Sequence, residues 1–203
     1  MDAILNVWSP GSEGGRAVAD VLFGDVNPSA KLTTSFPRNV GQLPLYYNHK
    51  NTGRPHPDEA PYKKFVSCYM DEVNAPLYPF GYGLSYTSYE YGPVTLSSAE
   101  MPLDGSVTAS VTVTNTGKRD GDEIVQLYIH DIYATSTRPV KELRAFKKVH
   151  IPAGQSVQVD FDLSADDLSY YNHALEWVCE PGDFEIMIGP DSQETKGTVL
   201  TVL

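Results

Sequence analysis

The second half of the chain alternates between apolar and polar residues. Between residues 107 and 115, every second side chain up to Val113 is apolar, and most of the others carry a hydroxyl group. The same period of two returns in three later segments, which turns such as Pro181-Gly182-Asp183 separate. Successive side chains of a β-strand point to opposite faces, so this pattern predicts short strands with one buried face. We expect about seven of them, packed as an antiparallel β-sandwich. The residues predicted to face its core are Val107, Ala109, Val111, Val113, Val125, Leu127, Ile129, Val157, Val159, Phe161, Leu163, Phe184, Ile186 and Ile188.

A different pattern occupies the first 36 residues. Residues 3–8 form a nearly continuous apolar run, which is typical of a strand covered on both faces. Residues 13–23 place Ala17, Val18, Val21 and Leu22 on one helical face, with Ser12 as the predicted N-cap and Gly24 as the left-handed stop. Residues 31–36 can form a second strand. One helix cannot cover both faces of a parallel sheet, so we expect the rest of this α/β unit to lie upstream of residue 1.

The stretch between these two patterns has no sustained period. Residues 37–80 are rich in Pro, Tyr, Asn and His, and a stretch of this length is typical of a functional loop or an interdomain connection. Its many aromatic rings favour an ordered segment packed on another surface. The predicted organisation is therefore a remnant of an α/β domain over residues 1–40, a connecting segment over residues 41–86 and a β-sandwich over residues 87–203.

Composition narrows the classes of partner. The formal net charge of −11 disfavours a nucleic acid or an anionic membrane surface as partner, because both attract Lys and Arg. No run approaches the ~20 apolar residues that cross a bilayer, and we expect no membrane partner. Cys68 and Cys179 lie far apart without a CxxC or His-rich context, so we interpret both as reduced, while a single disulfide in a secreted protein stays open. We expect no cofactor and no metal site.

Two pairs of adjacent carboxylates invite a glycosidase interpretation, because hydrolysis of sugars uses two carboxyl groups at a set separation. Asp122-Glu123 and Asp166-Asp167 each fall at the edge of a strand or the start of a helical turn, so we assign them to turns and caps, with Ser164 and Asp167 forming a capping box. His130-Asp131 suggests a fragment of a triad, but no GxSxG nucleophile elbow accompanies it. No catalytic residue is therefore predicted in this chain.

The candidate binding residues lie on loops. The glycine-rich residues 10–15 follow a predicted strand and lack the spacing of a nucleotide-binding loop, but ligands of α/β sheets bind at such turns. Asn48, His49, Arg54, His56 and Asp58 form the densest polar cluster of the connecting segment, without metal-ligand spacing. We interpret this loop either as a cover over a neighbouring domain's pocket or as a solvated loop. Under the first interpretation, Glu13, Arg54 and His56 are the predicted rim of a substrate pocket.

Several long motifs carry a resemblance to a known family. Residues 10–29, PGSEGGRAVADVLFGDVNPS, followed by Leu32 and residues 35–37, resemble the closing segment of the α/β sandwich domain in family-3 glycoside hydrolases. Residues 76–86, PLYPFGYGLSY, are similar to the junction between that domain and the family's fibronectin type III-like module. Residues 113–117, 121–128 and 142–148 continue the match, with Ala145 where the family often has Gly. Residues 42–49 look most like the bacterial β-glucosidase and β-xylosidase branch.

The resemblance implies a retaining exo-acting enzyme that releases glucose or a related sugar from β-linked glycosides, periplasmic or secreted. In the family the nucleophile lies in an N-terminal barrel and the acid/base residue in the earlier part of the sandwich domain, and neither maps onto this sequence. We therefore expect the chain alone to be inactive, with missing catalytic domains as its partners and a β-linked oligosaccharide bound only through the whole enzyme. The alternative is a carbohydrate-binding or interaction module, although Tyr128, Tyr133, Tyr170, Tyr171 and Trp177 fall in no obvious row.

Overall fold

The computed structural model describes residues 3–203, and most of its regular structure is β. The strands of the second half are β1 (Tyr89–Tyr91), β2 (Thr95–Leu96), β3 (Glu100–Met101), β4 (Ser106–Asn115), β5 (Gly121–Asp131), β6 (Glu142–Ile151), β7 (Ser156–Ser164), β8 (Tyr170–Tyr171), β9 (Trp177–Val178), β10 (Gly182–Gly189) and β11 (Lys196–Val202). The helical elements are α1 (Gly14–Phe23), the 3-10 turn η1 (Val40–Gln42) and α2 (Ala165–Leu168).

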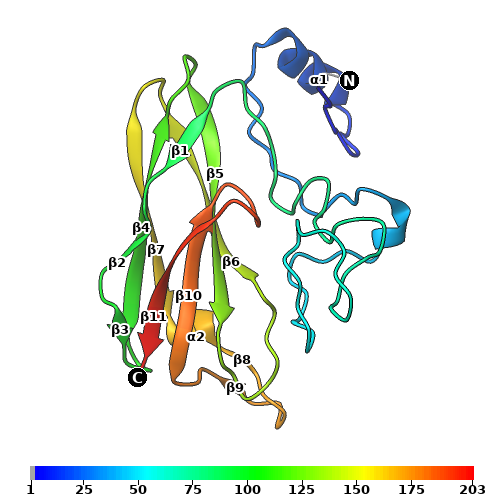
Figure 1. Cartoon of the computed structure of the whole chain (residues 1–203). Helices are drawn as coiled ribbons and strands as arrows, with labels where there is room; N and C mark the ends of the chain where they lie inside the picture. Colours follow the sequence, from blue (N-terminus) through cyan, green and yellow to red (C-terminus); the bar gives the residue numbers. More distant parts are fainter. Residues whose placement is uncertain (1–2) are drawn as a thin grey trace.

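Two sheets face each other and form the predicted sandwich (Figure 1). One sheet has the order β1-β4-β2, with β7 also paired to β4, and the other has the order β3-β11-β10-β5-β6. All pairs are antiparallel except β3 with β11. β8 and β9 form a separate hairpin next to α2. The antiparallel sandwich predicted for the second half of the chain is therefore confirmed.

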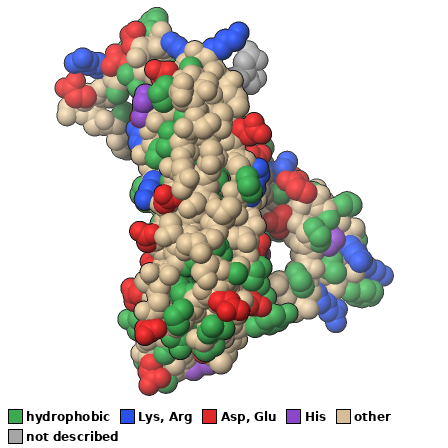
Figure 2. Space-filling view, turned by 90° about the vertical axis from the view of Figure 1, so that its left-hand side faces the viewer, with side chains coloured by type: hydrophobic (Ala, Val, Ile, Leu, Met, Phe, Trp, Pro, Cys, Tyr) green, Lys and Arg blue, Asp and Glu red, His purple; other side chains and the backbone are tan. Residues whose placement is uncertain are grey.

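The core follows the predicted alternation. The apolar side chains predicted to point inward on β4, β5, β7 and β10 are buried, apart from Val157, which is half-buried at the edge of the core. Burial of this kind is worth about 25 cal/mol per Å² of apolar surface, which makes it the main stabilising contribution to the domain. The outward side of β4 carries hydroxyl groups, and few charged side chains appear in the middle of the face that Figure 2 turns to the viewer.

The helix α1 forms as predicted, with two differences. Its N-cap is Glu13 instead of Ser12, and no side chain caps the first turn. Gly24 ends the helix in the left-handed conformation, with φ at 83°, as the sequence indicates. The predicted apolar face is not covered, because Ala17 and Leu22 are exposed and Val18 and Val21 are only half-buried.

The prediction of strands at residues 3–8 and 31–36 is wrong, because neither segment forms a strand in the structure. Residues 3–8 are exposed and have no backbone partner in a sheet, and a lone strand leaves its N–H and C=O groups unpaired. Residues 31–36 instead run beside residues 78–82 as irregular structure, with hydrogen bonds from Leu32 N to Tyr82 O and from Phe36 N to Tyr78 O, both 2.8 Å. The single bridge between Phe36 and Tyr78 replaces the expected strand.

The connecting segment packs along the β5-β6 side of the sandwich (Figure 1). The ring of Tyr47 stacks on Phe80 with a centroid distance of 4.2 Å and meets Tyr128 of β5 edge-on at 6.0 Å. Its hydroxyl oxygen accepts a hydrogen bond from Leu143 N at 3.2 Å. The aromatic content therefore produces an ordered segment, and it covers the outer side of β5, where Gln126 and Tyr128 are buried.

Candidate functional site

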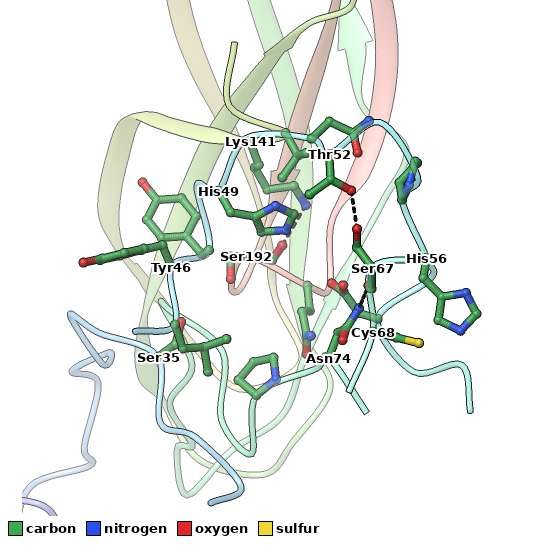
Figure 3. A pocket seen from close by; sticks show the side chains of 18 of the residues that line it. Ser35, Tyr46, His49, Thr52, His56, Ser67, Cys68, Asn74, Lys141 and Ser192 are labelled. Atoms are coloured by element: carbon green, nitrogen blue, oxygen red, sulfur yellow. Dashed lines mark hydrogen bonds between the residues drawn. The ribbon is translucent and has the colours of Figure 1, made fainter. Parts of the chain in front are cut away.

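A cavity of about 730 Å³ lies between the connecting segment and the sandwich (Figure 3). Its volume is within the range of ~300 to 1,000 Å³ that is typical of small-molecule sites. Most of its walls come from residues 44–76, and the β5-β6 and β10-β11 loops close it through Lys141, Ser192 and Gln193. The side chains that can donate or accept hydrogen bonds at its surface include Ser35, His49, Asn51, Thr52, His56, Asp58, Ser67, Asn74, Lys141, Ser192 and Gln193.

Local hydrogen bonds fix the polar wall. The hydroxyl groups of Thr52 and Ser67 are 2.7 Å apart, and Asn74 Nδ2 donates to the carbonyl oxygen of Ser67 at 2.9 Å. Lys141 Nζ donates to Ser192 O at 2.7 Å and to Thr195 Oγ1 at 3.0 Å. Burial lowers the pKa of the Lys141 ammonium. These contacts hold hydroxyl, amide and ammonium groups in fixed positions around the cavity.

Of the three residues predicted to form a pocket rim, His56 alone is among the described residues that line this cavity. His56 lines the cavity at its outer edge in Figure 3, and its Nε2 lies 2.9 Å from Pro61 O. Arg54 is exposed outside the cavity wall, with one long hydrogen bond of 3.4 Å from Nη1 to Phe65 O. Glu13 lies at the start of α1, apart from the connecting segment in Figure 1. Their role as a rim stays a prediction.

The cavity has no pair of carboxylates. Asp58 is the one acidic side chain among the described residues that line it. Both geometries of glycoside hydrolysis use two carboxyl groups across the sugar, and the described lining of this cavity supplies one. No group of three His, Cys, Asp or Glu side chains with metal-binding geometry occurs within residues 3–203.

The adjacent carboxylates found in the sequence have structural partners. Asp122 accepts from His150 Nδ1 at 2.8 Å and lies 3.1 Å from Lys148 Nζ, while Glu123 points inward to Lys31. Asp167 completes the predicted capping box with Ser164, which is confirmed. Asp166 Oδ1 accepts from Trp177 Nε1 at 2.6 Å.

The side chain of Asp122 makes a pH-dependent contribution to stability. Its hydrogen bond with His150, followed by the one with Lys148, lowers the pKa of the Asp122 carboxyl below its ordinary value. A carboxyl whose pKa is lower in the folded state stabilises above the unfolded pKa of about 3.9, and loses this contribution as the pH falls through the folded pKa. Because the group is about one-third exposed, we expect Asp122→Asn to cost less than about 1 kcal/mol at neutral pH.

Urea unfolding of the wild type and of Asp122→Asn measures this effect. The difference between the two free energies of unfolding should be present at neutral pH and disappear at about pH 2. An equal difference at both pH values would contradict the assignment of the stabilisation to the ionised carboxylate.

Several residues of the cavity were not found from the sequence. Tyr47 lies within residues 42–49 and Lys141 directly before residues 142–148, both quoted for the family resemblance, but no local pattern indicates that the chain brings the two to one cavity. Cys68 lines the cavity as a free thiol, and Cys179 is also free, with the pKa of its thiol raised by burial.

Among the described residues, no helix combines the length and the apolar character that a membrane crossing requires.

Comparison with known proteins identifies both halves of the chain. Residues 1–86 match the glycosyl hydrolase family 3 C-terminal domain, and residues 123–192 match the fibronectin type III-like domain. The periplasmic beta-glucosidase of Salmonella typhimurium is 53% identical over 195 residues, which are 96% of this chain and 25% of that protein. A beta-xylosidase of Formosa agariphila is 44% identical over 202 residues, covering 98% of this chain and 27% of that protein.

A solved structure gives the same result in three dimensions. The beta-glucosidase from Listeria innocua in complex with glucose superposes with a TM-score of 0.93 at 44% identity, over 99% of this chain and 28% of that one. The chain thus spans about a quarter of the length of the relatives it matches. It carries the family-3 C-terminal domain segment and the fibronectin type III-like domain in the order of these enzymes, and it belongs to the family-3 glycoside hydrolases.

Proposed function

We propose that this chain is the part of a retaining, exo-acting β-glycosidase that braces the catalytic domains, and that it is inactive by itself. Its substrates would be β-linked glucosides or related glycosides, in line with the beta-glucosidase and beta-xylosidase names of its relatives. The name of the Salmonella protein also supports a periplasmic or secreted location for the whole enzyme. The chain takes no cofactor in this role.

One observation carries the proposal: the apolar face of α1 is open to solvent. Leu22 and Phe23 are 64% and 84% exposed, and Trp8 in the preceding loop is 64% exposed. An amphipathic helix normally buries this face against a sheet, and exposed patches of this kind mark interaction surfaces. The layers that would cover it belong to the three quarters of the related enzymes that this chain does not span.

The connecting segment supplies a second surface for the same neighbours. Phe65 and Met70 of this segment are 74% and 80% exposed. Arg54 and His56 lie on the same segment, and Glu13 lies at the glycine-rich turn before α1. We infer that the three residues reach the rim of a pocket that the catalytic domains complete, where the Arg54 guanidinium donates to sugar hydroxyls.

A chimera tests the proposal. This chain replaces the matching region of the Salmonella periplasmic beta-glucosidase, and hydrolysis of p-nitrophenyl β-D-glucoside is measured for the chimera and for the chain alone. We expect turnover by the chimera and none by the chain, because the chain holds no carboxylate pair at the cavity. In the chimera, Arg54→Ala should raise KM if Arg54 contacts sugar.

A chimera without the sandwich serves as the control for bracing, and it should lose its activity together with its thermal stability. Turnover by the chain alone would refute the proposal. So would a folded, full-length chimera that hydrolyses no aryl β-glycoside.

A further inference from the structure

Two exposed aromatic rings lie side by side on the β8-β9 hairpin, at the end of the sandwich opposite to α1 (Figure 1). Tyr171 and Trp177 are direct cross-strand partners, with ring centroids 4.9 Å apart and planes inclined by 56°. They are 66% and 46% exposed. Of the five aromatic residues considered for a sugar-binding row, Tyr128 and Tyr170 are buried, and Tyr133 has no ring partner within residues 3–203.

Polar contacts with α2 and within the hairpin turn hold the two rings in place. Trp177 Nε1 donates to Asp166 Oδ1 at 2.6 Å, which fixes the indole ring against α2. In the hairpin turn, Asn172 Oδ1 accepts from the backbone N–H groups of Ala174 and Glu176 at 2.9 and 3.0 Å. The neighbouring Tyr170 is buried and anchors the strand. A site that is rigid before binding loses little conformational entropy when it binds.

The chemistry around the rings favours a sugar. An aromatic face is electron-rich, and it attracts the weakly positive C–H bonds on the flat face of a pyranose. On the same hairpin, Asn172 Nδ2 donates to Glu176 Oε2 at 3.1 Å, and the exposed Glu176 carboxylate can accept further hydrogen bonds from the hydroxyls at the edge of a sugar ring. Leu175, 81% exposed at the turn, extends the apolar strip by one residue. An anionic ligand is disfavoured by the net charge of −11.

We propose that Tyr171 and Trp177 form a binding platform for a β-linked glucan chain, separate from the cavity. Because the ring planes are inclined, each ring would contact a different unit of a twisted chain. The platform would hold a polymeric substrate near the whole enzyme and would itself cleave nothing. The choice of a β-glucan rests on the proposed function, whereas the presence of a sugar platform does not.

Affinity electrophoresis of the whole chain tests the proposal. A native gel containing soluble β-glucan should retard the wild type relative to a gel without polysaccharide. Tyr171→Ala and Trp177→Ala should each abolish the retardation, and Trp177→Phe should retain part of it. Tyr133→Ala is the matched control, because it removes a ring that is 84% exposed but stands alone, and it should migrate as the wild type does. Circular dichroism and urea unfolding confirm that each variant is folded.

Fluorescence gives the affinity. The chain has two Trp residues, Trp8 and Trp177, so a Trp8→Phe variant reports on the platform alone. Titration with cellopentaose should give a saturable change in its emission, and adding Tyr171→Ala should weaken binding about tenfold, or about 1.4 kcal/mol.

The proposal is overturned if the wild type is not retarded, or if Tyr133→Ala loses as much retardation as Tyr171→Ala. It is also overturned if sedimentation velocity shows a dimer that Trp177→Ala dissociates while no glucan is bound, because the rings would then be an interface between copies. These measurements need no turnover, so an inactive chimera leaves the platform intact, and a failed platform leaves the proposed glycosidase intact.

Discussion

Lys31→Met is expected to lower the free energy of unfolding of the sandwich by about 3 kcal/mol or more. Lys31 Nζ lies 3.1 Å from Glu123 Oε1, and the two side chains are only 10% and 4% exposed. Tyr91 of β1 donates to the same carboxylate oxygen at 2.8 Å, and burial together with the nearby Glu123 raises the pKa of its hydroxyl. Removing the lysine leaves a buried carboxylate without its cation, which costs more than the intact pair contributes.

The same pair joins distant parts of the chain, since Lys31 Nζ also donates to Gly83 O at 3.3 Å. We therefore expect Lys31→Met to increase protease cleavage within residues 41–86 as well. Urea unfolding measures the first effect, and limited proteolysis the second. Arg16→Met is the control, because its ion pair with Asp20 is 3.8 Å long and exposed, and its loss should cost less than about 1 kcal/mol. A double variant with Glu123→Gln should recover part of the loss, and equal effects of Lys31→Met and Arg16→Met would contradict the prediction.

The sandwich could be predicted from the sequence because its alternation is local. Each apolar residue of β4 marks the same face as the residue two positions away, so no distant contact is needed to assign it. The outer side of β5 shows the limit of this reasoning. Gln126 and Tyr128 have the polar groups of solvent-facing positions, but the connecting segment buries them, and no period within β5 encodes that cover.

The prediction of strands at residues 3–8 and 31–36 is wrong for a related reason. A strand needs hydrogen-bond partners, and these lie in other parts of a sheet. Residues 3–8 have no such partner within residues 3–203, and Trp8 is exposed, so the apolar run by itself does not produce a strand. The candidate site was the least predictable part, because the cavity combines Lys141 with loop residues about 90 positions earlier.

Gly81→Ala is expected to disrupt the junction between the connecting segment and β5. Gly81 has a φ of 82°, and a Cβ atom there would collide with the amide of Gln126. That amide is buried and fully used: Nε2 donates to Gly81 O at 3.1 Å and to Pro190 O, and Oε1 accepts from Tyr128 OH at 2.6 Å. The new methyl group therefore adds the cost of unpaired buried groups, about 1–3 kcal/mol each, to the strain of about 1–2 kcal/mol for a left-handed alanine.

Gly154→Ala separates these two costs. Gly154 has a similar φ of 72°, but nothing lies within 4 Å of the position of its Cβ, so only the backbone strain remains. Urea unfolding should give a loss of about 1–2 kcal/mol for Gly154→Ala and at least twice that for Gly81→Ala. Hydrogen exchange should locate the additional effect at residues 78–82 and along β5. Equal losses for the two variants would mean that the amide of Gln126 does not hold the connecting segment to the sandwich.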